Sequence, residues 1–502
     1  MKLLPVVLSL FISNAALSAA PEDALGAGFW HTSGKQILDG NGQQVRIAGV
    51  NWFGLETSTF APHGLWVRGY KDMLEQMKAL GYNTVRLPYS NQLFDPESKA
   101  NGIDYSKNPD LEGITTVEII DKIVVHAKKI GLKILLDRHR PDSNGQSALW
   151  YTSSYPESRW IADWTMLAER YKADSTVIGA DLHNEPRTPA CWGCGNPDID
   201  WRMAAERAGN AILAKNPNWL IIVEGVEFNS DSFYWWGGNL KGVAENPVTL
   251  DVANRVVYSA HDYPSSISTQ TWFNAPDYPA NLPAVWDAYW GYIAKKDIAP
   301  VLLGEFGTKL ETSSDKQWFD ALVKYLGTGA EGIHWMFWSW NPNSGDTHGL
   351  LLDDWMTVDE RKQEKLRTIQ FPAGSASAPP STPTTASPVS APAKSFCTAA
   401  YRVWSDWGTG FSGEASVTNT GAGPIDGWAI TWSFPGNQQI REMWNGRPTQ
   451  TAQAVMVKDI GWNAKLPEQT SVLFGFVGEY SGQNTAPDVF RLNGLPCDSA
   501  KP

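Results

Sequence analysis

The sequence predicts an α/β fold, a (β/α)8 TIM barrel over residues 21–372, followed by a smaller all-β sandwich over residues 395–502. Three observations predict this organisation. Eight apolar, β-rich runs alternate with amphipathic helical stretches, a segment without charges or aromatic rings follows them, and the last part has short alternating stretches with little helical signal. A chain of 502 residues is long enough for a large barrel plus a small domain.

The barrel prediction depends on the eight runs and their order. They are residues 45–51 (VRIAGVN), 84–89 (TVRLPY), 133–139 (KILLDRH), 177–184 (VIGADLHN), 220–226 (LIIVEGV), 256–263 (VVYSAHDY), 300–306 (PVLLGEF) and 333–340 (IHWMFWSW). Several are almost continuously apolar, as expected for parallel strands that are buried on both faces. Helical patterns such as 71–80 and 117–130 lie between them, which indicates a TIM barrel. A doubly wound open sheet is the competing architecture, but no glycine-rich nucleotide fingerprint supports it.

Residues 1–20 are predicted to be a secretory signal peptide that is not part of the fold. Lys2 gives a positive start, residues 3–12 are apolar, and residues 15–20 are mostly small, as in exported proteins. A membrane anchor needs about 20 consecutive apolar residues, and neither this segment nor a later one is that long. We therefore expect a secreted, extracellular and soluble protein without a membrane partner.

Residues 373–394 are predicted to be a linker. Of the 21 residues from 373 to 393, nineteen are Pro, Ala, Ser or Thr. This composition cannot bury a core, and its prolines keep the chain extended. Beyond the linker, stretches such as 415–419 and 428–434 alternate apolar and polar residues between Gly, Asn and Pro turns, which predicts a β-sandwich.

Composition narrows the classes of partner. The chain has 41 Lys and Arg against 53 Asp and Glu, a net charge of -12, which argues against nucleic acid or an anionic membrane. Its 25 Trp suit stacking on sugar rings, although packing is the simpler explanation for any single ring. The four Cys lie in two pairs, Cys191 with Cys194 and Cys397 with Cys497, although four Cys allow three connectivities. Disulfides are expected in an exported protein. A zinc site at Cys191 and Cys194 is not supported, because no second Cys pair lies at the spacing that zinc sites have.

The predicted strands end in side chains suited to catalysis, which in a TIM barrel stand at the carboxyl ends of the strands. The ends carry Arg86, His139, Asn184-Glu185-Pro186, His261-Asp262-Tyr263, Gly304-Glu305-Phe306-Gly307 and Trp338-Ser339-Trp340-Asn341. Hydrolysis of an acetal needs one carboxyl group to protonate the leaving oxygen and another to meet the oxocarbenium-like centre. Glu185 and Glu305 supply such a pair. Ion pairing with Arg86 is the structural alternative for the same two glutamates.

This set of motifs resembles the signature of glycoside hydrolase family 5, in the same order, over about residues 22–371. The runs 49–57 (GVNWFGLET) and 339–347 (SWNPNSGDT) resemble its bacterial endo-β-1,4-glucanase branch. The resemblance implies a secreted cellulase that hydrolyses internal β-1,4 bonds of cellulose by a retaining double displacement, with no cofactor and no metal. One alternative is the same chemistry on mannan, xyloglucan or mixed-linkage glucan. A non-catalytic carbohydrate-binding protein is the alternative of another class, but it would require that one glutamate be missing.

The resemblance also implies roles for single residues. Glu305 would be the nucleophile, and Glu185 the proton donor and then the general base. Arg86 and Tyr263 would hydrogen-bond Glu305 and keep it ionised. Asn184 would meet the sugar 2-hydroxyl, a contact that strengthens in the transition state.

Further implied site residues are polar or aromatic. His139 and His261 would complete the polar shell, with His261 supporting Glu185. Trp338 would form the floor of the subsite that holds the attacked sugar, and Trp340, two residues on, is the alternative for that role. Glucose units away from the cleaved bond would contact Trp52, Trp235 and Trp236.

The C-terminal part resembles carbohydrate-binding module family 2. The resemblance is carried by Cys397, 407–411 (WGTGF), 427–428 (GW), Trp444, 462–463 (WN), 474–476 (FGF), 492–494 (LNG) and Cys497. It implies that Trp407, Trp444 and Trp462 stack on crystalline cellulose and that Trp428 lies in the core. The region around Arg447 leaves a xylan-binding variant open. Tethering would raise the local concentration of substrate, and we expect a monomer that binds β-1,4-glucan chains.

Overall fold

The computed structural model describes residues 25–229, 232–371, 397–421, 423–461, 463–487 and 489–499. The chain divides into two compact units between residues 379 and 380. The predicted signal peptide and the whole of the predicted linker lie outside the described residues, so both stay predictions. Among the helices of the described ranges, none has the length and hydrophobicity needed to cross a membrane.

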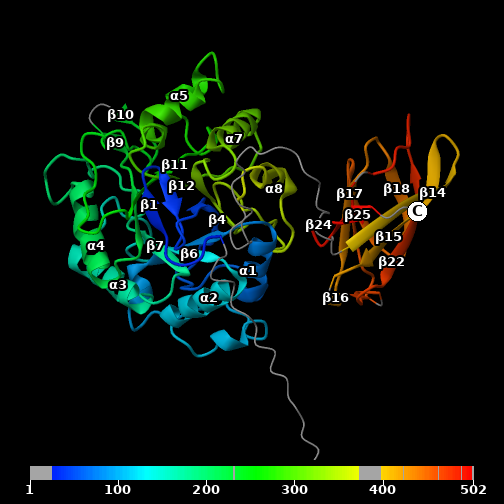
Figure 1. The fold of residues 1–502 in the computed structure, drawn as a ribbon, viewed down its shortest axis with the longest axis horizontal. Coiled ribbons are helices and arrows are strands. Elements are labelled where there is room, and N and C mark those ends of the chain that lie inside the picture. Colours follow the sequence, from blue (N-terminus) through cyan, green and yellow to red (C-terminus); the bar gives the residue numbers. More distant parts are fainter. Residues whose placement is uncertain are drawn as a thin grey trace, which may run out of the picture. The chain divides into compact units, whose positions relative to one another are not determined.

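Eight parallel strands close into a barrel in the first unit (Figure 1). Around the barrel they are β4 (Ala48–Asn51), β5 (Thr84–Ser90), β6 (Lys133–Arg140), β7 (Val177–Asp181), β8 (Leu220–Glu224), β11 (Val256–His261), β12 (Val301–Glu305) and β13 (His334–Phe337). Each of the eight predicted runs overlaps one of these strands. The predicted (β/α)8 barrel is therefore confirmed.

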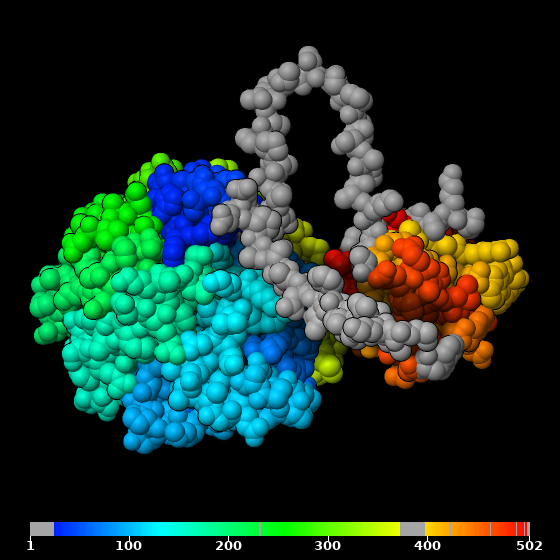
Figure 2. All heavy atoms as spheres, turned by 60° about the horizontal axis from the view of Figure 1, so that its bottom comes forward, coloured from blue at the N-terminus to red at the C-terminus, as the bar shows by residue number. Residues whose placement is uncertain are grey.

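Helices surround the barrel strands (Figure 1). They are α1 (Tyr70–Ala79), α2 (Thr116–Ile130), α3 (Glu157–Arg170), α4 (Trp201–Lys215), α5 (Leu282–Trp286), α6 (Tyr292–Lys295), α7 (Ser313–Leu326) and α8 (Glu360–Arg367), with shorter turns η1 (Asn91–Phe94), η2 (Pro109–Leu111), η3 (Thr271–Asn274) and η4 (Asp287–Gly291). Helix α2 begins with a capping box, in which Thr115 and Glu118 each satisfy the other's backbone N–H. The cyan segment that contains α2 and α3 covers a continuous part of the surface of the first unit (Figure 2).

The amino end of the barrel is closed by a small sheet of β1 (His31–Ser33), β2 (Gln36–Leu38) and β3 (Gln44–Val45). Its Ile37 and Val45 belong to one buried cluster with barrel residues such as Leu135, Leu220 and Leu302. Apolar side chains therefore fill the barrel at this end. A short hairpin of β9 (Phe228–Asn229) and β10 (Ser232–Phe233) follows β8.

The second unit is a β-sandwich, as predicted. One sheet has the order β18 (Gln439–Trp444), β22 (Ser471–Glu479), β15 (Gly410–Asn419), β14 (Cys397–Asp406) and β25 (Asp498–Ser499). The other has the order β19 (Arg447–Thr451), β20 (Ala454–Lys458), β17 (Ala429–Ser433), β23 (Arg491–Leu492) and β24 (Leu495–Pro496), and β16 (Ile425–Asp426) pairs with β21 (Lys465–Leu466). Phe474 and Phe476 from the first sheet pack with Trp432 from the second. Trp428 is buried in this core, and a disulfide joins Cys397 to Cys497.

Candidate active site

The carboxyl ends of the barrel strands bring the predicted catalytic residues together. Each polar member of the set is at most 9% exposed: Arg86 on β5, His139 on β6, Asn184 and Glu185 after β7, His261 on β11, Tyr263 after it, and Glu305 at the end of β12. Trp338 directly follows β13 and is only partly buried. The site therefore gathers residues from six different strands.

Glu305 is held by both of the contacts that were predicted for it. Its Oε1 accepts a hydrogen bond from Arg86 Nη1 at 2.6 Å, and its Oε2 accepts one from Tyr263 Oη at 2.7 Å. Burial alone would raise the pKa of Glu305, but the charges of His261 and Arg86 lower it below its ordinary value. This carboxylate is consequently kept ionised and fixed in orientation, as a nucleophile requires.

The lowered pKa of Glu305 predicts the acidic limb of the pH profile. The predicted nucleophile must be ionised to act, and the pKa of Glu305 lies below the ordinary value for Glu, which is about 4.3. As the pH falls, kcat/KM should therefore decline only below about pH 4.3. Initial rates on a soluble cello-oligosaccharide, measured over a range where the circular dichroism spectrum is constant, test this. An acidic limb centred above that value would contradict the assignment.

Glu185 approaches Glu305 closely and has its own partners. Its Oε1 lies 3.0 Å from His261 Nδ1, and its backbone N–H donates to Glu224 Oε2 at 2.7 Å. One carboxylate oxygen of Glu185, one of Glu305 and a ring nitrogen of His261 all lie within 4.8 Å of one another. The backbone of Glu185 has φ of 54°, a left-handed conformation that is uncommon outside glycine.

His261 links the two glutamates. Its Nδ1 also lies 3.6 Å from Glu305 Oε2, and its Nε2 lies 3.3 Å from Glu224 Oε1. Burial would lower the pKa of His261, but the carboxylates of Glu224 and Glu305 raise it well above the ordinary value. A protonated His261 can donate to Glu185 and adds positive charge between the glutamates.

Arg86 lies beneath the site, fully buried among four carboxylates. It contacts Glu305, Asp181 Oδ2 at 2.9 Å, Asp137 Oδ2 at 3.1 Å and Glu224 Oε1 at 3.1 Å. Burial raises the pKa of both Asp181 and Glu224 to about 7. Sequence reasoning missed these three carboxylates beside Arg86. The available signal was an acidic residue within or at the end of an otherwise apolar run, in KILLD, VIGAD and LIIVE.

His139, Asn184 and Trp338 complete the predicted set. Burial lowers the pKa of His139 well below its ordinary value, and its Nδ1 lies 2.7 Å from Asp137 Oδ2. The rings of His139 and Trp338 are within 10° of parallel, with centroids 5.3 Å apart. Asn184 Oδ1 accepts from Arg86 at 3.0 Å, whereas its buried Nδ2 has no partner among the described residues. That donor remains available, and the predicted contact with a sugar hydroxyl stays a prediction.

The structure corrects two of the predicted sugar-binding tryptophans. Trp52 and Trp340 have no exposed surface, so neither ring has a face that could stack on a sugar. Strand β13 ends at Phe337, and the two-residue alternation that placed Trp340 beside Trp338 does not continue beyond it. Both rings pack in the core of the first unit.

The other two tryptophans predicted to bind sugar, Trp235 and Trp236, differ in their exposure. Trp235 is almost fully buried and meets Tyr263 edge to face, with ring centroids 6.1 Å apart. Trp236 is 44% exposed, and the guanidinium of Arg187 lies 4.3 Å from the centre of its ring. Of the two rings, Trp236 therefore retains a face for a sugar.

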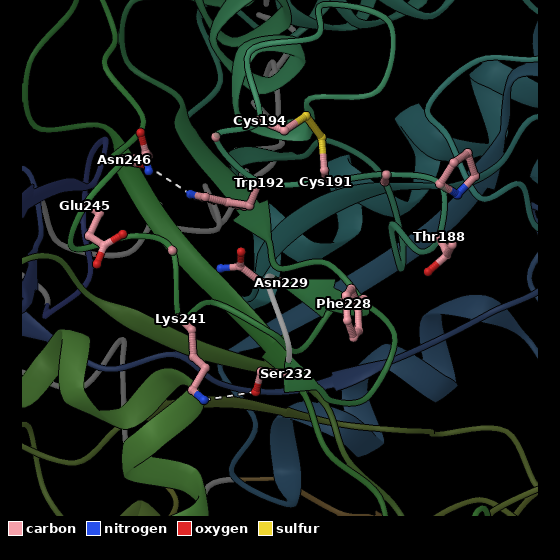
Figure 3. A pocket seen from close by; sticks show the side chains of 14 residues that line it. Thr188, Cys191, Trp192, Cys194, Phe228, Asn229, Ser232, Lys241, Glu245 and Asn246 are labelled. Carbon is pink, nitrogen blue, oxygen red and sulfur yellow. Dashed lines mark hydrogen bonds between the residues drawn. A yellow bond between two sulfur atoms is a disulfide. The ribbon is translucent and has the colours of Figure 1, made fainter.

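A pocket of about 660 Å³ opens beyond Glu185, between the loops that follow β7 and β8 (Figure 3). Thr188 and the predicted Cys191–Cys194 disulfide line one part of it, and Phe228 and Lys241 line another. Lys241 Nζ donates to Ser232 Oγ at 2.9 Å. The predicted catalytic residues are not among its lining, so it is separate from the glutamate pair.

In the second unit, Trp407 is 54% exposed and Trp444 is 39% exposed. Both rings are thus exposed to solvent, as expected for rings that stack on cellulose. Trp462 lies outside the described residues.

For both units, comparisons with known proteins agree with the families that the sequence resembles. The model of the cellulases, glycosyl hydrolase family 5, matches residues 38–344, and that of the cellulose binding domain matches residues 397–497. An endoglucanase of Paenibacillus polymyxa is 56% identical over 375 residues, which cover 73% of this chain and 94% of the relative. The major extracellular endoglucanase of Xanthomonas campestris pv. campestris is 39% identical over 496 residues, 93% of this chain and 99% of the relative.

Solved structures give the same result for the first unit. The catalytic domain of the Xanthomonas campestris enzyme is similar with a TM-score of 0.65 and 44% identity, covering 68% of this chain and 99% of that chain. A hyperthermophilic endocellulase from the archaeon Pyrococcus horikoshii is similar with a TM-score of 0.64 and 40% identity, covering 68% of this chain and 97% of that chain.

Proposed function

Because the chain belongs to the cellulases of glycosyl hydrolase family 5, we propose that it is an endo-β-1,4-glucanase that cleaves cellulose with retention of configuration. The observation that carries the mechanism is the proximity of Glu185 and Glu305, with carboxylate oxygens within 4.8 Å. Retaining glycosidases hold the two carboxyl groups about 5–5.5 Å apart, whereas inverting enzymes leave about 6.5–9.5 Å for a water molecule.

In the first step, Glu305 attacks the anomeric carbon while Glu185 gives its proton to the leaving glycosidic oxygen. The C–O bond to the leaving sugar breaks, and a covalent glycosyl-enzyme forms on Glu305. In the second step, the Glu185 carboxylate takes a proton from water, whose oxygen displaces Glu305. Arg86 and Tyr263, each bonded to Glu305, stabilise its charge when it is released.

We assign the remaining parts of the chain to secretion and targeting. Residues 1–20 would direct export, residues 21–372 form the catalytic domain, residues 373–394 link the domains, and residues 395–502 bind cellulose. The match to a cellulose binding domain and the exposed Trp407 and Trp444 support the last assignment. The Xanthomonas campestris relative is named extracellular, which supports export of this protein, and we expect it to act as a monomer.

Proton NMR of cellopentaose, mixed freshly with the mature protein, tests the proposal. Retention gives an initial β-anomer that appears before mutarotation. An initial α-anomer would overturn the nucleophilic role of Glu305. No product from cellopentaose, together with hydrolysis of a manno- or xyloglucan oligosaccharide, would transfer the proposal to another β-glycan.

A further inference from the structure

A tryptophan ring that received no role from the sequence, Trp404, lies on the surface of the second unit. Trp404 on β14 is 47% exposed, and its ring centroid lies 6.0 Å from that of Trp444, with 28° between the planes. Trp404 stands where the register between β14 and β15 shifts, and such bulges redirect a side chain. Exposed large rings that gather on one face mark interaction sites more often than isolated ones.

The backbone of the same sheet is shaped to receive flat rings. A Cβ atom on Gly475 of β22 would collide with the ring of Trp444, and one on Gly410 of β15 would lie 2.7 Å from the ring of Trp407. The two rings therefore lie against glycine backbone and turn their other faces outward. In the sheet order β18-β22-β15-β14, Trp444 and Trp404 start from non-adjacent strands and meet across this face.

We propose that Trp404 is a fourth contact ring of the cellulose-binding surface and stacks on pyranose faces together with Trp407 and Trp444. The inference rests on cellulose binding by the second unit, as proposed above. Near-parallel rings at 6.0 Å offer an extended apolar surface, which matches the uncharged C–H faces of a β-glucan better than a charged partner. Loss of such a ring from a surface of several contacts should weaken binding without abolishing it.

Binding isotherms of the full chain on microcrystalline cellulose test this role. Trp404→Ala should raise the Kd about 5–10-fold, whereas Trp404→Phe, which keeps a ring, should stay within about twofold. Leu495→Ala is the matched control, because Leu495 is 45% exposed on the other sheet. Hydrolysis of soluble cellopentaose should be unchanged in all three variants. An unchanged Kd for Trp404→Ala would overturn the proposal.

Oxidative footprinting separates direct contact from support of Trp444. Cellulose should protect both Trp404 and Trp444 from oxidation by N-bromosuccinimide. Oxidation of Trp404 at the rate of the unbound protein, while Trp444 is protected, would reduce Trp404 to a packing role. A wild-type chain that hydrolyses cellopentaose but does not bind cellulose would instead refute the proposed function of the second unit.

A separate observation concerns Glu224, the last residue of β8. It is fully buried, and its two oxygens have different partners. Oε2 accepts the backbone N–H of Glu185 at 2.7 Å, while Oε1 contacts Arg86 Nη2 at 3.1 Å and His261 Nε2 at 3.3 Å. One carboxylate thus touches the backbone of the acid, the histidine that bonds the acid, and the arginine that bonds the nucleophile.

We infer that Glu224 is a positioning residue for the proton donor. It has no exposed surface with which to meet substrate. It acts through the backbone of Glu185 and through the ring of His261, whose Nδ1 contacts Glu185. The charged groups that face Glu224 are Arg86 from β5, Asp137 from β6, Asp181 from β7 and His261 from β11.

Glu224→Gln tests this inference, with Asp181→Asn as its matched control. Asp181 is also fully buried and bonds Arg86, and within the part of the chain that the structure describes it forms no hydrogen bond or ion pair with Glu185. A glutamine amide cannot accept from all three neighbours, so kcat on cellopentaose should fall about 10–100-fold with KM within about twofold. The alkaline limb of the pH profile should move to lower pH, because the pKa of His261 loses a raising charge.

An aryl cellobioside with a good leaving group provides the check on folding. The first step on this substrate depends little on the proton donor, so Glu224→Gln should release the phenol of the first turnover at close to the wild-type rate, which a misfolded variant would not. Equal losses on both substrates, or the same pH profile for Glu224→Gln and Asp181→Asn, would overturn the positioning role. Failure of cellopentaose hydrolysis by the wild-type chain would refute the proposed function instead.

Discussion

Glu305→Gln is expected to abolish hydrolysis while leaving substrate bound. The amide is almost isosteric with the carboxylate but cannot attack the anomeric carbon, so kcat should fall by at least about 10⁴-fold, the order seen when a nucleophile is removed. Oligosaccharide binding, measured by calorimetry with cellopentaose, should change by less than about tenfold. The loss therefore falls almost entirely on kcat.

Chemical rescue identifies the role of Glu305 more sharply than loss of activity. With azide as an external nucleophile, Glu305→Ala should form the α-glycosyl azide from an activated aryl cellobioside, because a single displacement inverts the anomeric centre. Leu310→Ala, a change of a buried apolar side chain that keeps both glutamates, is the control and should form no α-glycosyl azide. Hydrolysis by Glu305→Gln at near the wild-type rate would disprove the nucleophile assignment.

Glu185→Ala is expected to separate substrates by their leaving groups. A sugar leaving group needs protonation, so kcat/KM on cellopentaose should fall about 10²–10⁴-fold. The first step on an aryl cellobioside with an acidic phenol needs little protonation and should remain fast. Stopped-flow measurement of phenol release should then show a burst, because hydrolysis of the glycosyl-enzyme lacks its general base.

Azide also tests the role of Glu185 as proton donor and general base. Added azide should accelerate turnover of the Glu185→Ala glycosyl-enzyme and yield the β-glycosyl azide, after two inversions. Equal losses on the natural and aryl substrates, without a burst, would show that Glu185 is not the proton donor. The opposite anomers expected for the two variants make the assignments of Glu185 and Glu305 independent of each other.

The barrel and its two glutamates were predictable because both depend on local pattern. Parallel strands buried on two faces need continuous apolar runs, and the polar residue that ends such a run must lie at the carboxyl rim. Glu305 ends a run of this kind, and Glu185 closely follows another. The motif resemblance then gave each glutamate a role, and the structure brings their oxygens within 4.8 Å.

The carboxylates around Arg86 were harder to predict. Asp137, Asp181 and Glu224 lie in the same apolar runs, where an acidic residue can face either the barrel interior or the surrounding helices. Only the closed barrel places all three within reach of one buried guanidinium. Their contacts depend on strand order and register, which single runs do not contain.

The roles of the tryptophans separate what sequence and structure decide. The sequence by itself determined the domain order, the strands, the pair of glutamates at the strand ends and the abundance of rings suited to sugars. Only the tertiary structure decided which rings have a free face: Trp52 and Trp340 are enclosed, while Trp236 and Trp404 are exposed. The physical reason is that an indole gains free energy both by packing and by stacking on a sugar. Its neighbours in space, and not in sequence, select between the two.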